Sequence, residues 1–248
     1  MLNAVKSLLL LTLAPSLTVA QDVKETDLSA ATKQYRAYRV QNTEPSYGLA
    51  KVKAAIRQTK PTKGEDMDSV VLAPSVWTRL STAERFTYCM LHGEVSSQNC
   101  DEMPWIVDEE HKVFAYPPSF HDAEESWSKR QLAFMKGNRT AVIRLLRETM
   151  AAKERVGVNL KNAITEIGAF ELIPDLVKLY DRDHKDQDLL SVMAVLMKEG
   201  KDKPFLASIT YRKLYGPEAN YQSFIVANPE NQKLMTDRAM AFYRRRVG

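Results

Sequence analysis

Glycine is scarce in this chain: only 9 of its 248 residues are glycine. Leucine, alanine, lysine, glutamate, methionine and arginine are plentiful instead, and these residues favour helix over sheet. Beyond the N-terminal segment there is no long apolar run, so no later segment is expected to span a membrane. The formal net charge is only +4, which does not indicate nucleic-acid binding. We therefore predict an all-α chain with no nucleic-acid partner.

The first twenty residues have the pattern of a secretory signal peptide. Lys6 precedes a short apolar run at 8–14, and small residues end the segment at Ala20. A membrane anchor is the alternative, but Pro15 interrupts the run well before the roughly 20 apolar residues that a spanning helix needs. We expect residues 1–20 to be removed and the mature chain to be exported, periplasmic or secreted, without a transmembrane segment.

Cysteine is rare too, since Cys89 and Cys100 are the only two. In an oxidising compartment an isolated pair is most simply a disulfide, so we predict a Cys89–Cys100 bridge. The alternative is a catalytic thiol, in which case Cys100 would be the nucleophile and His92, His111 or His121 its base.

The first half of the chain has little regular patterning. Residues 21–46 are polar and are expected to form a loose N-terminal arm. Residues 47–126 are predicted to be a helical and loop region, in which a capping box at Ser81–Glu84 opens one helix. The irregular part that follows Gly93 would be pinned by the predicted disulfide, with a short strand at Val113–Tyr116.

Apolar residues recur at helical spacing from 127 to the end at 248, which we predict to be a helical-repeat-like region. The expected helices cover Trp127–Met135, Thr140–Lys153, Val158–Ile167, Glu171–Asp181, Gln187–Glu199, Phe205–Tyr215, Glu218–Val226 and a last helix that begins at Pro229 with Asn228 as its N-cap. Two of them, Glu171–Asp181 and Gln187–Glu199, are apolar almost all round, so each should be buried on more than one side.

Two helix pairs recur at a fixed distance. Residues 140–168 and 171–200 both run helix, turn, helix, glycine, and the closing glycines lie 32 positions apart. Fixed periods of this size are typical of stacked helix-pair repeats, in which no pair can bury its apolar face alone.

The stretch Ala163–Gly168, followed by Ile173–Val177 and Asp181–Asp183, resembles a HEAT repeat. In that pattern a helix ends in Ile-Gly, a proline lies in the first turn of the next helix, and a charged Asp-x-Asp turn follows. Pro174 suits this place because first-turn amides lack acceptors within the helix. The resemblance covers about residues 140–200 and implies a short stack of antiparallel helices, commonly used as a binding surface. An irregular helical bundle is the alternative fold.

Three of the four histidines fall in the irregular segment, together with many carboxylates. His92, Glu94, His111, His121 and Asp122 are the candidate catalytic residues, because imidazole and carboxylate groups can act as general acid and base. The same three histidines are candidate metal ligands. Their spacing matches no known metal or catalytic motif, and there is no phosphate-binding loop, so we predict no metal or cofactor.

These observations lead to an interpretation with two alternatives. We interpret the chain as an exported helical interaction module of the cell envelope or extracellular space, which binds a protein, peptide or glycan. The first alternative is a secreted enzyme, such as a metal-assisted hydrolase, with its site in the His92–Glu125 region. The second is a purely structural domain of an envelope assembly.

Overall fold

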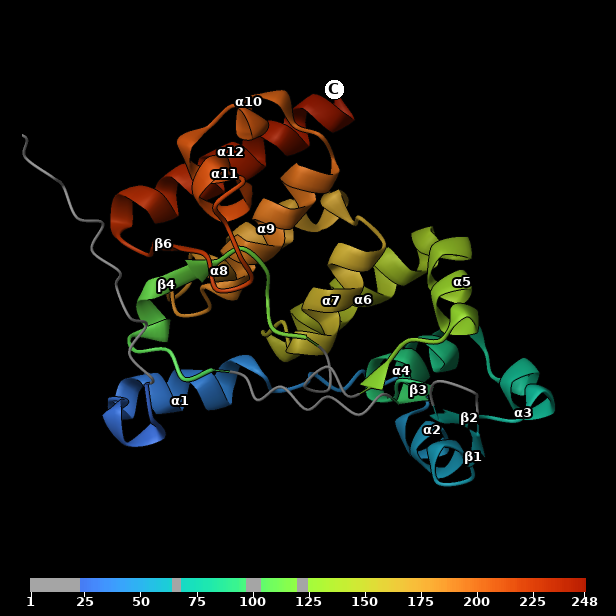
Figure 1. The fold of residues 1–248 in the computed structure, drawn as a ribbon. Helices are drawn as coiled ribbons and strands as arrows, with labels where there is room; N and C mark the ends of the chain where they lie inside the picture. The colour runs from blue at the N-terminus through green and yellow to red at the C-terminus, as the bar shows by residue number, and fades with distance from the viewer. Residues whose placement is uncertain (1–22, 64–67, 97–103, 120–124) are drawn as a thin grey trace, which may run out of the picture.

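The computed structural model describes residues 23–63, 68–96, 104–119 and 125–248. Helices make up most of these residues (Figure 1), which confirms the prediction of a mostly α-helical chain. The α-helices are α1 Ala30–Arg39, α2 Leu49–Ile56, α3 Pro74–Arg79, α4 Thr82–Leu91, α5 Lys129–Gly137, α6 Arg139–Lys153, α7 Val158–Glu166, α8 Ile173–Tyr180, α9 Asp188–Glu199, α10 Lys203–Leu206, α11 Ile209–Tyr215 and α12 Pro229–Val247. Short 3-10 helices cover Glu25–Asp27, Glu109–His111 and Phe170–Leu172.

The described strands form two small antiparallel sheets. One sheet contains, in spatial order, β1 Lys60–Lys63, β2 Asp68–Val71, β3 Val95–Ser96 and β5 Glu125–Ser126. The other pairs β4 Lys112–Phe114 with β6 Phe224–Val226, and its register places Val113 opposite Ile225. This second sheet joins the two halves of the chain, and its first strand lies where the short strand was predicted.

The helix predicted at Glu218–Val226 does not form, because its last three residues make β6. Phe224, Ile225 and Val226 are aromatic or β-branched, and such side chains suit a pleated strand. Ile225 is buried in the core while its two neighbours point to solvent. The partner strand is far away in the sequence, so local periodicity could not reveal it.

Helix α9 lies at the centre of the helical half (Figure 1), where it contacts α7, α8, α10, α12 and β4. Every residue from Asp188 to Met197 is buried, which confirms the prediction that this helix is buried on more than one side. Helix α8 is less completely buried. It contacts both α9 and α12 and buries Ile173, Leu176 and Tyr180, while its Val177 and Leu179 are only partly buried against the core. The difference follows from position, since α9 is enclosed by more elements than α8.

The two predicted N-terminal helix caps, at Ser81 and at Asn228, are both confirmed. At α4 the Ser81 hydroxyl accepts from the Glu84 amide, and the Glu84 carboxylate accepts from the Ser81 amide at 2.8 Å. At α12 the Asn228 side chain accepts from the Asn231 amide at 2.9 Å, and Pro229 opens the helix. These bonds satisfy amides that a helix leaves free in its first turn.

The prediction of a loose arm at 21–46 is wrong for the described residues, 23–46. They contain α1, whose N-cap Ser29 accepts a hydrogen bond from the Thr32 amide at 3.0 Å. Helix α1 buries Thr32, Tyr35 and Arg39 on one face against the helical body. Few apolar residues lie in this stretch, so polar and charged contacts make up much of its packing against the helical body.

The segment after α1 supplies the cap of α7. The Val158 amide donates to the Gln41 carbonyl at 3.0 Å, and the Gly157 amide donates to Thr43 Oγ1 at 2.9 Å. The Asn159 side chain accepts from the Thr43 amide and donates to the Thr43 carbonyl, both at 2.9 Å. The two backbones come so close that a Cβ on Gly157 would lie 2.3 Å from the Thr43 nitrogen. Only glycine fits there without a shift of the backbone.

We therefore expect Gly157→Ala to lower the free energy of unfolding by about 1–3 kcal/mol, the usual cost of overpacking a tight contact. Urea denaturation followed by circular dichroism would measure it. Gly137→Ala is the matched control, because nothing lies within 4 Å of a Cβ at that position. Alanine at the end of α5 should be neutral or stabilise by up to about 1 kcal/mol. Equal effects of the two variants would contradict the close contact.

Candidate functional site

A buried ion network attaches α1 to the centre of the fold. Arg39, in the last turn of α1, donates from Nη2 to Asp188 Oδ1 at 2.5 Å and from Nε to Asp188 Oδ2 at 3.1 Å. Its Nη1 also donates to Glu109 Oε2 at 3.2 Å. All three residues are buried, with exposed fractions of 4% for Arg39, 1% for Asp188 and 0% for Glu109. Such a bidentate guanidinium–carboxylate pair is strongly directional.

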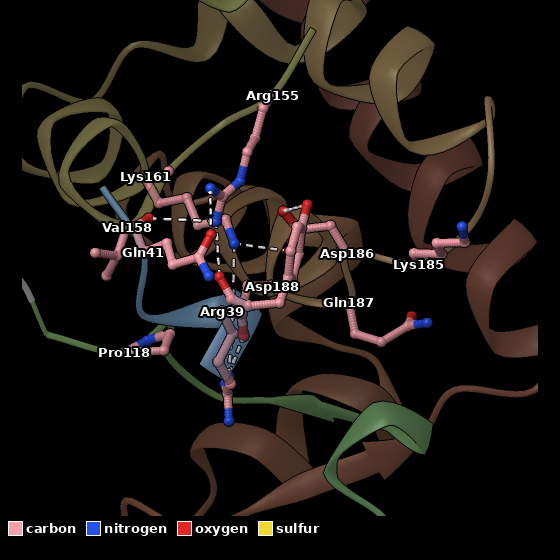
Figure 2. Close-up of polar contacts among 12 residues, drawn as sticks. Arg39, Gln41, Pro118, Arg155, Val158, Lys161, Lys185, Asp186, Gln187 and Asp188 are labelled. Carbon is pink, nitrogen blue, oxygen red and sulfur yellow. Dashed lines mark hydrogen bonds and ion pairs between the residues drawn. The ribbon is translucent and has the colours of Figure 1, made fainter. Parts of the chain in front are cut away.

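Lys161 of α7 completes the network from another side. Its Nζ lies 2.7 Å from Asp186 Oδ1 and 3.4 Å from Asp188 Oδ2, and its side chain is 1% exposed. Figure 2 shows the Lys161 and Arg39 side chains converging on Asp188. A buried charge is tolerated only when it is paired and hydrogen-bonded. The network therefore requires α1, α7 and the start of α9 to keep one relative placement.

The two aspartates respond to this environment in opposite ways. Burial would raise the pKa of Asp188, but Arg39 and Lys161 outweigh burial and hold that pKa below its ordinary value. Burial raises the pKa of Asp186, and Lys161 opposes the increase only in part. Asp188 thus stabilises its two cations as a carboxylate.

An open groove of about 710 Å³ lies beside this network. One wall is α1, which contributes Ala31, Gln34, Tyr35 and Tyr38. The other walls are the end of α6 and the turn after it, at 153–155, the turn after α8, at 182–185, and Glu110. The Tyr38 hydroxyl donates to Asp186 Oδ2 at 3.3 Å, which joins the groove wall to the ion network. Its size falls within the range of about 300–1,000 Å³ typical of ligand sites.

Arg155 is the most firmly held cation of this groove. Its guanidinium donates to Gln41 Oε1 at 2.9 Å (Figure 2). It also donates to the Tyr38 carbonyl at 2.7 Å and lies 4.5 Å from the centroid of the Tyr38 ring. Burial, followed by the charge of Asp186, raises the pKa of Tyr38 to about 12, so this phenol stays protonated at neutral pH. Among the described residues, the buried Arg155 Nε and Tyr35 hydroxyl have no hydrogen-bond partner.

A smaller cavity of about 220 Å³ is lined by two members of the network, Arg39 and Glu109. Most of its other lining residues are apolar or aromatic, among them Phe114, Tyr116 and Tyr221. The Arg39 guanidinium lies 4.7 Å from the centroid of the Phe114 ring. Glu109 is also paired with Arg36 at 2.5 Å, so the charged lining of this cavity is already neutralised by internal contacts.

Two candidate catalytic residues, His92 and Glu94, are buried at the end of α4. His92 Nε2 donates to the Val70 carbonyl at 2.7 Å, and its Nδ1 lies 3.7 Å from Glu125 Oε2. Glu94 accepts from the Tyr88 hydroxyl at 2.9 Å. It also accepts from Ser128 and pairs with Arg130. Both residues thus tie α4 to β2, β5 and α5, and neither lines the two cavities described above.

The other candidates are not brought together with this pair. His111 ends a 3-10 helix, is exposed, and contributes its carbonyl to the Ala227 amide at 2.8 Å. His121 and Asp122 lie outside the described residues. Within the described ranges, no group of three or more His, Cys, Asp or Glu side chains is placed so that it could hold a metal ion. The candidate metal ligands His92 and His111 therefore share no described metal-binding group.

The predicted disulfide is not present. Cys89 is a free, buried cysteine in α4, and Cys100 lies outside the described residues. Burial, followed by the charge of Glu94, raises the pKa of the Cys89 thiol well above its ordinary value. A protonated thiol packed in a core is an inert apolar side chain, so Cys89 is not suited to nucleophilic catalysis.

The ion network was not predicted from the sequence, although two features of the sequence indicate it. Lys161 stands three residues before the apolar Ile164, so it lies on the buried side of its helix. Arg39 follows Tyr35 by four residues, which places both on one face of a helix that was not predicted. A charged residue on an apolar face implies a buried partner, but the sequence does not say which carboxylate that partner is.

Comparisons with protein family models, with curated proteins and with solved structures found no match for this chain. Among the described residues, no helix combines the length and the apolar character needed to cross a membrane.

Replacing Asp188 by asparagine should destabilise the protein strongly, because Arg39 and Lys161 lose their shared carboxylate. We expect the free energy of unfolding at pH 7 to fall by about 3–5 kcal/mol, the usual cost of breaking a buried ion pair. The pKa of Asp188 is lowered in the folded state. Its contribution is therefore present above the unfolded pKa of about 4 and is lost as the pH falls through the folded pKa. The difference in the free energy of unfolding between wild type and variant should therefore become smaller as the pH is lowered.

Asp237→Asn is the control for this measurement. Asp237 pairs with Lys233 at 2.7 Å on the surface, and its side chain is 61% exposed. Loss of such a pair should change the free energy of unfolding by less than about 0.5 kcal/mol. A similarly small effect of Asp188→Asn would mean that the network does not hold α1 in place.

The burial of the Cys89 thiol leads to a further prediction. In a Cys100→Ser variant, Ellman's reagent should react with no thiol in native buffer and with one thiol per chain in denaturant, because the Cys89 thiol is buried and protonated. Wild-type protein serves as the comparison under the same denaturing conditions without reductant. If it shows no free thiol at all, Cys89 is oxidised and the free cysteine of the structure is contradicted.

Proposed function

We propose that this chain is an exported helical interaction module, and that its binding surface is the groove between α1 and the turns at 153–155 and 182–185. The observation behind this proposal is the groove itself, an open cavity of about 710 Å³. The buried ion network beside it fixes the placement of its α1 wall. Its partner would be a protein, peptide or glycan outside the cytoplasm. Export rests on the pattern of residues 1–20, which are outside the described ranges.

The contacts among α6 to α9 are those expected for the proposed HEAT-like repeat, and they support this assignment. Helix α6 contacts α7, α8 contacts α9, and α7 contacts α9. Pro174 lies in the first turn of α8, as the repeat pattern predicts. The two groove turns at 153–155 and 182–185 are the turns within the first and the second pair, so they are equivalent positions of the proposed repeat. In repeat proteins, equivalent segments commonly line one binding face.

The groove is also preorganised. Its α1 wall is held by Arg39 through the buried ion network and by the hydrogen bonds of Thr43 to Gly157 and Asn159. A surface that is ordered before binding loses less conformational entropy when a partner arrives. This order favours a role for the groove in recognition of a partner, and it is not what a chance gap between helices would require.

The enzyme alternative has less support from the described residues. Its two described candidates at the end of α4, His92 and Glu94, are occupied by internal hydrogen bonds and line neither cavity. The binding role is therefore the function that we propose.

Site-specific cross-linking in the native host would test this proposal. A photo-reactive benzoylphenylalanine replaces Gln34, an exposed residue of the α1 wall, in the full-length chain. Irradiation of whole cells should yield a covalent adduct in the fraction outside the cytoplasmic membrane. Mass spectrometry of the adducted chain should find that it begins at Gln21.

The control places the same photo-reactive group at Lys213, an exposed residue of α11 that does not line the groove. An adduct that forms from Gln34 and not from Lys213 locates the partner at the groove. Equal adducts from both positions, or none from Gln34, would refute the binding role of the groove. A chain that keeps residues 1–20 and stays in the cytoplasm would refute export on its own.

A further inference from the structure

The charges around the groove do not balance. Glu154 and Asp183 both lie near Arg182, whose guanidinium nitrogens are 3.6 Å and 3.8 Å from their carboxylates. Glu110 accepts a hydrogen bond from Thr32 Oγ1 at 2.9 Å. Three cations lining the same groove, Lys153, Arg155 and Lys185, form no ion pair with any described carboxylate. The uncompensated charge of the groove is therefore positive.

These three cations are held in different ways. Arg155 is fixed by carbonyl oxygens, which accept hydrogen bonds from its guanidinium, and its charge also acts on the buried Asp186. Lys153 and Lys185 are exposed on the two equivalent turns, and Figure 2 shows the Lys185 side chain pointing away from the buried aspartates. Arg155 is thus held by hydrogen bonds, whereas the two lysines are exposed.

From this arrangement we infer that the groove takes an acidic peptide segment of a partner protein, in extended form, with its carboxylates on Lys153, Arg155 and Lys185. This inference rests on the proposed function and names the partner's chemistry. An extended chain suits the site because the groove is open and runs past both turns. Glutamate and aspartate side chains supply the counterions, and a chain of several residues can reach the cations of both turns, which a single small anion cannot.

Fluorescence anisotropy with purified mature protein and a fluorescein-labelled octaglutamate peptide, at about 50 mM salt, would test the inference. Low salt keeps exposed ion pairs from being screened. We expect saturable binding of octaglutamate and none of a Gly-Ser octapeptide. In the double variant Lys153→Gln/Lys185→Gln the affinity for octaglutamate should fall about tenfold, the effect of losing two exposed ion pairs.

The matched control is the double variant Lys178→Gln/Lys213→Gln. These exposed lysines also lack a described ion pair and do not line the groove, so removing them lowers the net charge equally. We expect less than a twofold change in affinity. An equal loss in both double variants would overturn the inference, because it would show attraction by net charge alone.

Unlabelled polygalacturonate, a glycan that bears carboxylates, serves as competitor. If it displaces octaglutamate as effectively as free octaglutamate does at equal carboxylate concentration, the peptide assignment is overturned in favour of an acidic glycan. Absence of octaglutamate binding also overturns it. The in-cell adduct from Gln34 does not depend on the partner's charge, so it can still uphold the proposed function when the acidic-peptide inference fails.

Discussion

The carboxylate of Asp188 is the constraint on which the rest of this structure depends. It stands at the buried first turn of α9 and is shared by a guanidinium from α1 and an ammonium from α7. A buried ion that loses a partner costs several kcal/mol, so alternatives with α1 detached are strongly disfavoured. The network thus turns a polar N-terminal segment into a fixed wall, and that wall creates the groove.

A second set of contacts acts on the same segment and makes its placement unique. The ion network fixes the end of α1, and the hydrogen bonds of Thr43 to Gly157 and Asn159 fix the chain just after it. Hydrogen bonds of this kind need a defined register, whereas apolar burial alone would tolerate sliding. The turn that carries Arg155 is held by the same segment through the Tyr38 and Gln41 oxygens. Wall and cation are consequently positioned by one structural unit.

The histidine-rich segment shows why clustering in the sequence is a poor guide to a site. His92 and Glu94 serve as internal hydrogen-bonding groups where α4 meets two strands and α5. Titratable groups collect there because irregular backbone leaves polar groups that side chains must satisfy. The residues around the groove come instead from α1 and two separate turns, and no short stretch of sequence contains them. Charged residues from distant segments can be recognised as one site only when the structure shows that they line the same cavity.

What the sequence determined by itself was local: the helical character, the helix starts at Ser81 and Asn228, and the burial of α9. These follow from side-chain patterning and from amides that a cap must satisfy, which need only neighbouring residues. The tertiary structure alone decided that Cys89 is a free, buried thiol. It also decided that Phe224–Val226 is a strand and that the N-terminal segment packs on the helical body, and both of these depend on partners far away in the chain. The physical reason is that strand pairing and buried ion pairs join groups whose proximity exists only after folding.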